Sequence, residues 1–460
     1  MGMASVGKMS RGLWLGLAAL YALGVLYAST VISIVGFRPA GFDLAEGWRR
    51  FLTVRYIDHG SDQRADWTAN LLMIVPLGFM LTAALWPRQS RAWRLPAALG
   101  ALLLAVSYVL AVKFIQLWFP RTVTINYITA QTIGATIGVL AYGLGHEQLR
   151  RAVGHLHLGG RSGLVVALAV ATIAAILFTL VPFDIVVSPD DFASRLVRLP
   201  QVLFGMPGSG RSAGVRAVLL VGAFGLTLPM GMLLETLRPN RSMALIVPAA
   251  LLAMTALLIP SLFMLSTNPA LVTIPLHAIG FVAGVVVMRW LGRQNIARLR
   301  PWLPRAGWIA IPPYVLVVAT TNGLANGGWR TLSAALAERM DPNRLLPLWT
   351  YYNISKAQAV LSLATHVAMY APVGMLLWAI AGAGRWRGRQ AFILGLLLAA
   401  AVEMARWLHP GMVPEVNNLA VGALAAAFGT KLAPFLWKLL DDIAAERAAP
   451  APRRGLGRHL

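Results

Sequence analysis

The stretch that decides the fold is residues 67–86, WTANLLMIVPLGFMLTAALW, an apolar segment with a Pro-x-Gly at Pro76-Leu77-Gly78. It carries no charge over a length sufficient to cross about 30 Å of hydrocarbon as a helix. The same Pro-x-Gly returns inside apolar segments at Pro229-Met230-Gly231 and Pro372-Val373-Gly374. Returns after 153 and 143 residues indicate one module of roughly 150 residues used three times.

Composition places the chain among integral membrane proteins. Apolar residues make up 58% of it and charged residues 12%, against about 25% charged in a typical soluble domain. We predict an all-α, polytopic transmembrane helical bundle of about 12 spans, arranged as three parallel four-helix repeats. The predicted spans are 13–35, 67–86, 95–118 and 126–145, then 163–181, 215–237, 243–265 and 270–290, and finally 307–321, 358–380, 390–408 and 416–438.

The predicted domains follow these repeats. Residues 1–160 form the first unit, 161–305 a degenerate second unit, 306–440 the third unit, and 441–460 a basic cytoplasmic tail. Because each unit has an even number of spans, consecutive units should share one orientation. We therefore expect an axis along the membrane normal to relate them.

The positive charge of the chain orients it in the membrane. The net charge is +23, but the cations cluster in short loops between spans, such as Arg88, Arg91 and Arg94. This pattern is typical of cytoplasmic loops, so we predict both termini to be cytoplasmic, membrane lipids to be partners, and nucleic acid not to be one. The chain has no cysteine, which excludes disulfides and thiol chemistry.

Two polar pairs occupy equal places in the first and third units. Lys113 and Gln116 stand seven and four residues before a proline, and Glu403 and Arg406 stand at the same offsets from a later one. A three-residue spacing puts both side chains of a pair on one helix face. Polar groups inside a membrane are costly and usually face a cavity or the bundle interior. Glu403, His366 and Arg406 are therefore the candidates for catalysis.

Other polar residues lie at the same predicted depth, near the outer ends of the spans. The candidates for substrate binding are Asn70, Lys113, Gln116, Arg121, Gln131, His277, Asn417 and Asn418. A local ion pair or a satisfied core position explains each of them equally well, but the shared depth favours a common role. No metal-ligand spacing occurs, and we predict no metal and no cofactor. Spaced glycines in the fourth spans indicate close helix packing.

Each unit also has a long loop after its first span. Within these loops residues 44–52, 192–199 and 329–337 can form amphipathic helices with Trp or Arg beside Leu or Phe. Such a helix suits the membrane interface. An ordinary surface helix packed on the bundle is the alternative.

These residues resemble the VanZ-like family of bacterial membrane proteins. The residues of the first unit that carry the resemblance are Asp66, Asn70, Pro76-Leu77-Gly78, Gln116, Pro120-Arg121, Gly134 and Gly138, and those of the third are His366, Pro372, Gly374, Glu403, Pro410, Asn418 and Gly429. Lys113 stands where the family has an acidic residue, and Arg406 where it has Gln. No single unit holds the whole set, so an active site would have to be a composite across units.

The resemblance implies a role at the bacterial cell envelope, in the inner membrane, with the namesake linked to teicoplanin resistance. Our first hypothesis is a protein, not an enzyme, that binds or protects a lipid-linked cell-wall or glycan component at the outer face. The second is a membrane enzyme acting on a lipid-linked precursor or polysaccharide, with Glu403 as general base or His366 as proton shuttle. The third is a transporter.

Overall fold

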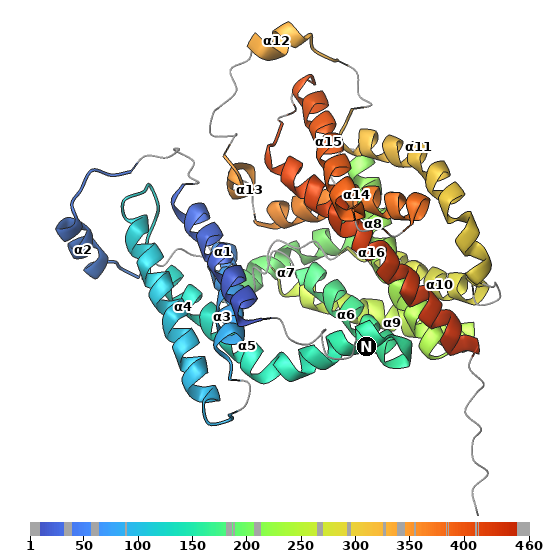
Figure 1. Ribbon diagram of the computed structural model, residues 1–460, viewed down its shortest axis with the longest axis horizontal. Helices are drawn as coiled ribbons and strands as arrows, with labels where there is room; N and C mark the ends of the chain where they lie inside the picture. Colours follow the sequence, from blue (N-terminus) through green and yellow to red (C-terminus); the bar gives the residue numbers. More distant parts are fainter. Residues whose placement is uncertain are drawn as a thin grey trace, which may run out of the picture. The chain divides into compact units, whose positions relative to one another are not determined.

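The computed structural model describes residues 10–31, 39–56, 64–87, 90–180, 186, 189–206, 213–264, 270–291, 296–324, 328–337, 346–353, 356–382, 384, 386–409, 412 and 414–448. Arg88, Pro410 and the tail beyond residue 448 lie outside the described residues. Every regular element among the described residues is a helix (Figure 1). The predicted all-α class is confirmed.

The chain divides into two compact units. The first comprises Met1–Gly154, Pro182–Ile185 and Met340–Ser362, and the second comprises His155–Val181, Val186–Arg339 and Leu363–Leu460. The helices of the first unit are α1 (Arg11–Thr30), α2 (Leu44–Leu52), α3 (Arg64–Leu85), α4 (Arg94–Gln116), α5 (Ile125–Leu158, whose end passes into the second unit) and α13 (Trp349–Asn353).

The second unit holds the remaining helices. They are α6 (Gly160–Leu180), α7 (Pro189–Phe204), α8 (Ala213–Leu237), α9 (Met243–Leu262), α10 (Thr273–Leu291), η2 (Ile296–Trp302), α11 (Leu303–Thr321), α12 (Leu332–Ala337), α14 (Lys356–Ala381, whose start belongs to the first unit), α15 (Arg387–Trp407) and α16 (Asn417–Ala448).

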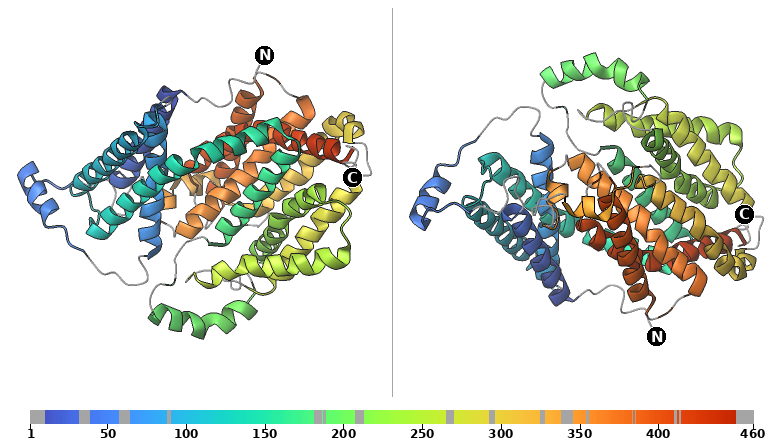
Figure 2. Two further views of the ribbon diagram at one scale, coloured as in Figure 1. Left: turned by 90° about the horizontal axis from the view of Figure 1, so that it is seen from below. Right: turned by 90° about the horizontal axis from the view of Figure 1, so that it is seen from above.

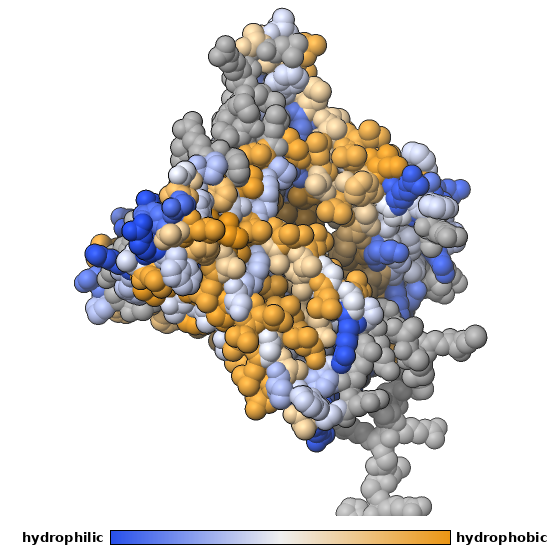
Figure 3. All heavy atoms as spheres, turned by 60° about the vertical axis from the view of Figure 1, so that its left-hand side comes forward, coloured by the Kyte–Doolittle hydropathy of each residue, from blue (hydrophilic) through white to orange (hydrophobic). Residues whose placement is uncertain are grey.

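Twelve helices among the described residues are long and apolar enough to cross a membrane, which confirms the predicted number of spans. They are α1, α3, α4, α5, α6, α8, α9, α10, α11, α14, α15 and α16. Figure 3 shows the broad hydrophobic surface that their outward side chains form. The sequence placed the ends of α5 and α16 too early, because each helix continues through polar residues that favour helix but lie past the apolar run.

The helices that carry Pro-x-Gly cross a later helix at glycine. A Cβ atom on Gly78 of α3 would collide with the carbonyl oxygen of Ala135 in α5, and one on Gly138 would collide with that of Val75. The same reciprocal relation holds between α8 and α10 and between α14 and α16, where the pairs are Gly231 with Phe281, Gly284 with Leu228, Gly374 with Ala426 and Gly429 with Ala371. The backbones touch at these points, which confirms the packing role predicted for the glycines.

The first helix of a group packs beside these crossing helices. In the first unit α1 contacts α3 and α4, and small side chains such as Ala18 and Ala105 let it approach Ile74 and Val109 in a fully buried cluster. The hydroxyl of Tyr21 in α1 donates to the carbonyl of Met73 over 2.7 Å. This bond fixes α1 against α3 three residues before the proline.

The predicted loop helices are present as α2, α7 and α12. Helix α2 has the predicted bounds, α7 is longer and α12 is shorter. In Figures 1 and 2 α2 lies at the edge of the first unit, where it contacts α4. Trp48 is 55% exposed, yet its ring lies 5.9 Å from that of Phe114. Helix α2 thus packs on the bundle by one edge and leaves apolar surface free.

Candidate functional site

The last turn of α4 carries one cluster of polar residues. Lys113 and Gln116 are 3% and 6% exposed. The Nε2 atom of Gln116 donates to the carbonyl of Ser29 over 3.1 Å, and Arg121 donates from Nη2 to the carbonyl of Ala28 over 2.8 Å. These carbonyls belong to the last turn of α1 and have no partner within that helix. Gln116 and Arg121 therefore fasten the end of α1 to the end of α4.

Lys113 has a different environment from its two neighbours. Its ammonium lies 5.5 Å from the centroid of the Tyr127 ring. Within the described part of the chain it makes no hydrogen bond and no ion pair, and the charge that acts on it is that of Arg121. Burial lowers the pKa of Arg121 to about 10, so this residue is still a cation at neutral pH. Two cations therefore lie at this helix end.

Asn70 and Gln131 form a bridge between α3 and α5 in the same unit. Gln131 donates from Nε2 to the Oδ1 atom of Asn70 over 2.8 Å, and Asn70 donates from Nδ2 to the carbonyl of Asp66 over 2.8 Å. Gln131 is 2% exposed. The bridge lies in the second turn of each helix, near the crossing at Gly134.

A second polar cluster centres on Glu403, in the last turns of α15. Its Oε1 atom accepts from Arg406 over 3.0 Å and from the side chain of Asn418 over 2.8 Å, and its Oε2 atom accepts from the backbone N–H of Glu415 over 2.7 Å. Glu403 and Asn418 are 6% and 0% exposed. The pair with Arg406 gives this buried carboxylate a counter-ion within the cluster.

The surroundings of Glu403 hold further buried polar atoms. The hydroxyl of Tyr370 and the Oδ1 atom of Asn418 are buried and have no hydrogen-bond partner among the described residues. The ring of His366 stacks on that of Tyr370 at 6.4 Å. Asn417 is buried at the first position of α16. Burial raises the pKa of Glu415, with repulsion from Glu403 adding to the effect and Arg406 opposing it.

The structure thus gathers most of the predicted site residues into clusters in two groups of helices. His277 joins neither cluster by any described contact. It is buried in α10, where its carbonyl accepts from the hydroxyl of Thr227 in α8 over 2.6 Å. This bond supports the packing of α8 on α10. Among the described residues no three His, Asp or Glu side chains come together as a metal site.

Comparison with protein families identifies the part of the chain that carries the first cluster. Residues 19–146 match the family described as VanZ/LLP1. This part of the chain is VanZ-like. The match begins inside α1 and ends inside α5, so it includes Asn70, Lys113, Gln116, Arg121 and Gln131. Comparisons with curated proteins and with solved structures gave no significant match.

The matched VanZ-like region has no acidic residue at the position of Lys113, while the unmatched α15 has Glu403 at the same offset from its proline. The departure from the family pattern noted in the sequence has a physical consequence. Lys113 has no ion pair among the described residues, whereas Glu403 is paired with Arg406.

An ion pair between α8 and α10 escaped prediction from sequence. The Nε atom of Arg289 lies 3.0 Å from Oε1 of Glu235, which is 2% exposed and also accepts from the backbone N–H of Asn240. Both residues lie near the C-terminal ends of their helices, whereas His277 lies near the N-terminal end of α10. The available signal was an acid and a base in the last turns of two helices that cross. Because its charges are paired with each other, this pair stabilises the packing of α8 on α10.

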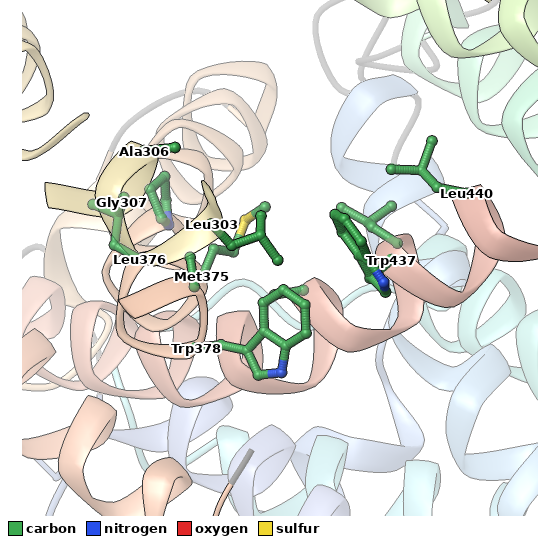
Figure 4. A pocket seen from close by; sticks show the side chains of 12 residues that line it. Leu303, Ala306, Gly307, Met375, Leu376, Trp378, Trp437 and Leu440 are labelled. Atoms are coloured by element: carbon green, nitrogen blue, oxygen red, sulfur yellow. The ribbon is translucent and has the colours of Figure 1, made fainter. Parts of the chain in front are cut away.

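One apolar pocket of about 470 Å³ lies between α11, α14 and α16 (Figure 4). Figure 4 shows Leu303 and Met375 opposite Trp437, with Trp378 between the two sides, and the centroids of the two indole rings are 6.3 Å apart. All its lining residues are apolar or glycine. It offers no group for chemistry, and we place the candidate site at the polar clusters.

Proposed function

We propose that this VanZ-like membrane protein binds the polar headgroup of a lipid-linked cell-wall or glycan component at the ends of its helices. The carrying observation is the buried cation Lys113, which makes no hydrogen bond and no ion pair among the described residues and lies beside a second cation, Arg121. Buried charges in membrane proteins mark ligand or ion sites. Basic pockets between spans suit anionic headgroups.

Three related units are part of this proposal. The glycine crossing recurs in three pairs of helices. A loop N–H after the first helix of each group also donates to a carbonyl at the end of the third helix, in the pairs Ala40 with Trp118, Val186 with Phe263 and Arg330 with Leu408. Tyr314 donates to Met369 over 2.8 Å, as Tyr21 does to Met73, at the same offset from the proline. These contacts support a tandem repeat of the VanZ-like unit.

The contacts of Glu403 favour binding over catalysis. A general base must be free to accept a proton from its substrate. The two oxygens of Glu403 already accept from Arg406, Asn418 and the backbone of Glu415, and no described contact joins it to His366. Proton abstraction would require breaking this set of bonds.

The charges of the loops support one orientation of the chain in the membrane. With both termini cytoplasmic in the inner membrane, as the basic loops favour, the ends of α4 and α15 lie at the outer face, which is where envelope precursors and glycopeptides meet the membrane. Protection against teicoplanin-like drugs would then follow from occupying or screening a headgroup.

The proposal is tested in a deletion strain complemented with the wild-type protein, Lys113→Met or Lys431→Met. Lys431 is an exposed lysine of α16, so its substitution makes the same chemical change away from the cluster. We expect altered glycopeptide susceptibility or an altered envelope lipid profile in the deletion strain, restored by the wild type and Lys431→Met and not by Lys113→Met. An unchanged susceptibility and lipid profile on deletion would refute it.

The same strains separate the alternative functions. If Glu403→Gln and His366→Ala both complement fully, an enzyme using these residues is excluded. Substrate-dependent uptake by proteoliposomes of the purified protein would instead support a transporter. If the protein binds a headgroup, we expect both variants to complement the deletion and the proteoliposomes to take up no substrate.

A further inference from the structure

Lys113 has no counter-ion among the described residues, and this is the starting observation. Two corresponding helix ends differ in this respect. At the end of α15 the buried Glu403 pairs with Arg406 at 3.0 Å. At the end of α4 the one contact that the described residues give the ammonium of Lys113 is the face of the Tyr127 ring, and Arg121 lies near it as a second positive charge. A buried charge is costly unless it is paired, so Lys113 calls for an anion that the described residues do not supply.

Gln116 limits what this component can be. Its Nε2 atom donates to the carbonyl of Ser29, so the orientation of the amide is fixed and its Oε1 atom points to the other side. That oxygen is buried and has no hydrogen-bond partner among the described residues. A ligand that satisfies Lys113 and Gln116 together, three residues apart on one helix face, needs an anionic group and a hydrogen-bond donor beside it.

We propose that Lys113 and Gln116 bind a phosphate group that carries a neighbouring hydroxyl, with Lys113 pairing the phosphate and Gln116 accepting from the hydroxyl. This inference rests on the proposed function and names the chemistry of the headgroup. Arg121, held on the carbonyl of Ala28, contributes its charge from the edge of the site. The phosphate can belong to a lipid headgroup or to a soluble phosphate, and the test distinguishes these sources.

The stabilities of two variants test the missing counter-ion. In the full-length protein, purified in a neutral detergent without added phosphate, we expect Lys113→Met to melt at the same temperature as the wild type or above it. Arg406→Met should melt lower, because it leaves Glu403 buried without its partner. A Lys113→Met protein that melts lower than the wild type would overturn the inference, since Lys113 would then be a structural cation at the negative ends of α1 and α4.

The binding measurement uses four probes on the same protein by microscale thermophoresis. Dioctanoyl phosphatidylglycerol has the phosphate and the hydroxyls, dioctanoyl phosphatidic acid has the phosphate alone, dioctanoylglycerol has no phosphate, and glycerol 1-phosphate has no acyl chain. We expect Lys113→Met to weaken both phospholipids about tenfold or more. Gln116→Leu should weaken the phosphatidylglycerol probe and not the phosphatidic acid probe.

The outcomes show whether the phosphate belongs to a lipid or to a soluble molecule, and they test this inference separately from the proposed function. If glycerol 1-phosphate competes with an affinity equal to that of the phospholipids, the site takes a soluble phosphate. If it does not compete, the site takes a lipid. The inference is overturned if dioctanoylglycerol binds as tightly as the phospholipids. It is also overturned if Lys113→Met binds both phospholipids as tightly as the wild type and the control Lys431→Met do. The deletion-strain phenotype is measured independently, so a failed phosphate site leaves the broader binding role to be judged by that phenotype.

Discussion

The Nε2 atom of Gln131 donates to the Oδ1 atom of Asn70 across 2.8 Å, and this bond joins two helices whose backbones touch at a glycine less than one turn farther along α5. Asn70 also donates to the carbonyl of Asp66, so its amide is used at both ends. A buried amide of this kind is stabilising only while both partners are present. The pair therefore couples the polar end of the first unit to its most tightly packed crossing.

This coupling is measurable as a non-additive effect on stability. Asn70→Leu and Gln131→Leu should each lower the free energy of unfolding by about 1 to 3 kcal/mol, because each leaves a partner amide unsatisfied. The double variant should lose less than the sum of the two, since it leaves neither. Thermal unfolding in detergent of the wild type and three variants gives the cycle. Additive losses would show that the two side chains do not interact.

The glycine crossings predict a position-specific cost for one methyl group. Gly78→Ala, Gly231→Ala and Gly374→Ala each place a Cβ atom against a backbone carbonyl, and we expect each to destabilise the protein by about 1 to 3 kcal/mol. Gly225→Ala, in the same helix as Gly231 but with open space around it, is the matched control and should be neutral or slightly stabilising. Equal melting temperatures for Gly231→Ala and Gly225→Ala would contradict the close crossing.

Glu403→Gln tests the role of the carboxylate in the second cluster. A carboxylate accepts from all three of its donors, whereas an amide has one oxygen and adds an N–H that opposes the donors around it. We expect a loss of about 3 to 5 kcal/mol, as for a broken buried ion pair. Lys431→Met, at an exposed site, is the reference for a change of one charge. An unaltered melting temperature for Glu403→Gln would show that the ion pair contributes nothing to the fold.

Glu415 predicts a pH dependence of stability. Burial raises its pKa above 4.5 in the folded protein, so the folded state holds the proton more tightly than the unfolded chain. The resulting stabilisation is complete below the unfolded pKa and is lost as the pH rises through the folded pKa. Glu415→Gln removes this loss. Its melting temperature should therefore gain on that of the wild type as the pH rises above the unfolded pKa, and a difference that stays constant with pH would refute the shift.

Two tyrosine hydroxyls donate to carbonyls that lie three residues before a repeat proline, and we expect their removal to lower stability equally. Tyr21→Phe and Tyr314→Phe each remove one bond to a carbonyl of the next helix in their group, that of Met73 or Met369. Each should cost about 1 kcal/mol, and the two losses should add because the bonds belong to different compact units. Tyr56→Phe, at an exposed residue, is the control. A loss from only one of the two would argue against equivalent contacts.

The spans and the crossing glycines could be predicted from sequence because each depends on local properties. Residues 67–86 are apolar over the width of a bilayer whatever their neighbours are. Gly134 and Gly138 lie on one helix face by their spacing alone. Lys113 with Gln116 and Glu403 with Arg406 could be placed near helix ends for the same reason.

The partners of these polar residues could not be predicted, because they depend on which helices lie side by side. Gln116 bonds to Ser29, 87 residues away, and nothing in the sequence of α1 marks that carbonyl. The backbone N–H that donates to Glu403 comes from Glu415, and nothing in the sequence marks that group as its partner. The difference between the paired Glu403 and the unpaired Lys113 became visible only with the contacts of the described residues.

The three glycine crossings constrain the order in which the chain can be assembled during its synthesis. In each crossing the two backbones that touch are separated by roughly 50 to 60 residues, and a whole intervening span lies between them. A Pro-x-Gly helix that has just left the ribosome therefore waits in the bilayer for a partner that is inserted two spans later. In the first group α3 can pack on α1 at once, but its glycine crossing forms only after the next two spans are inserted.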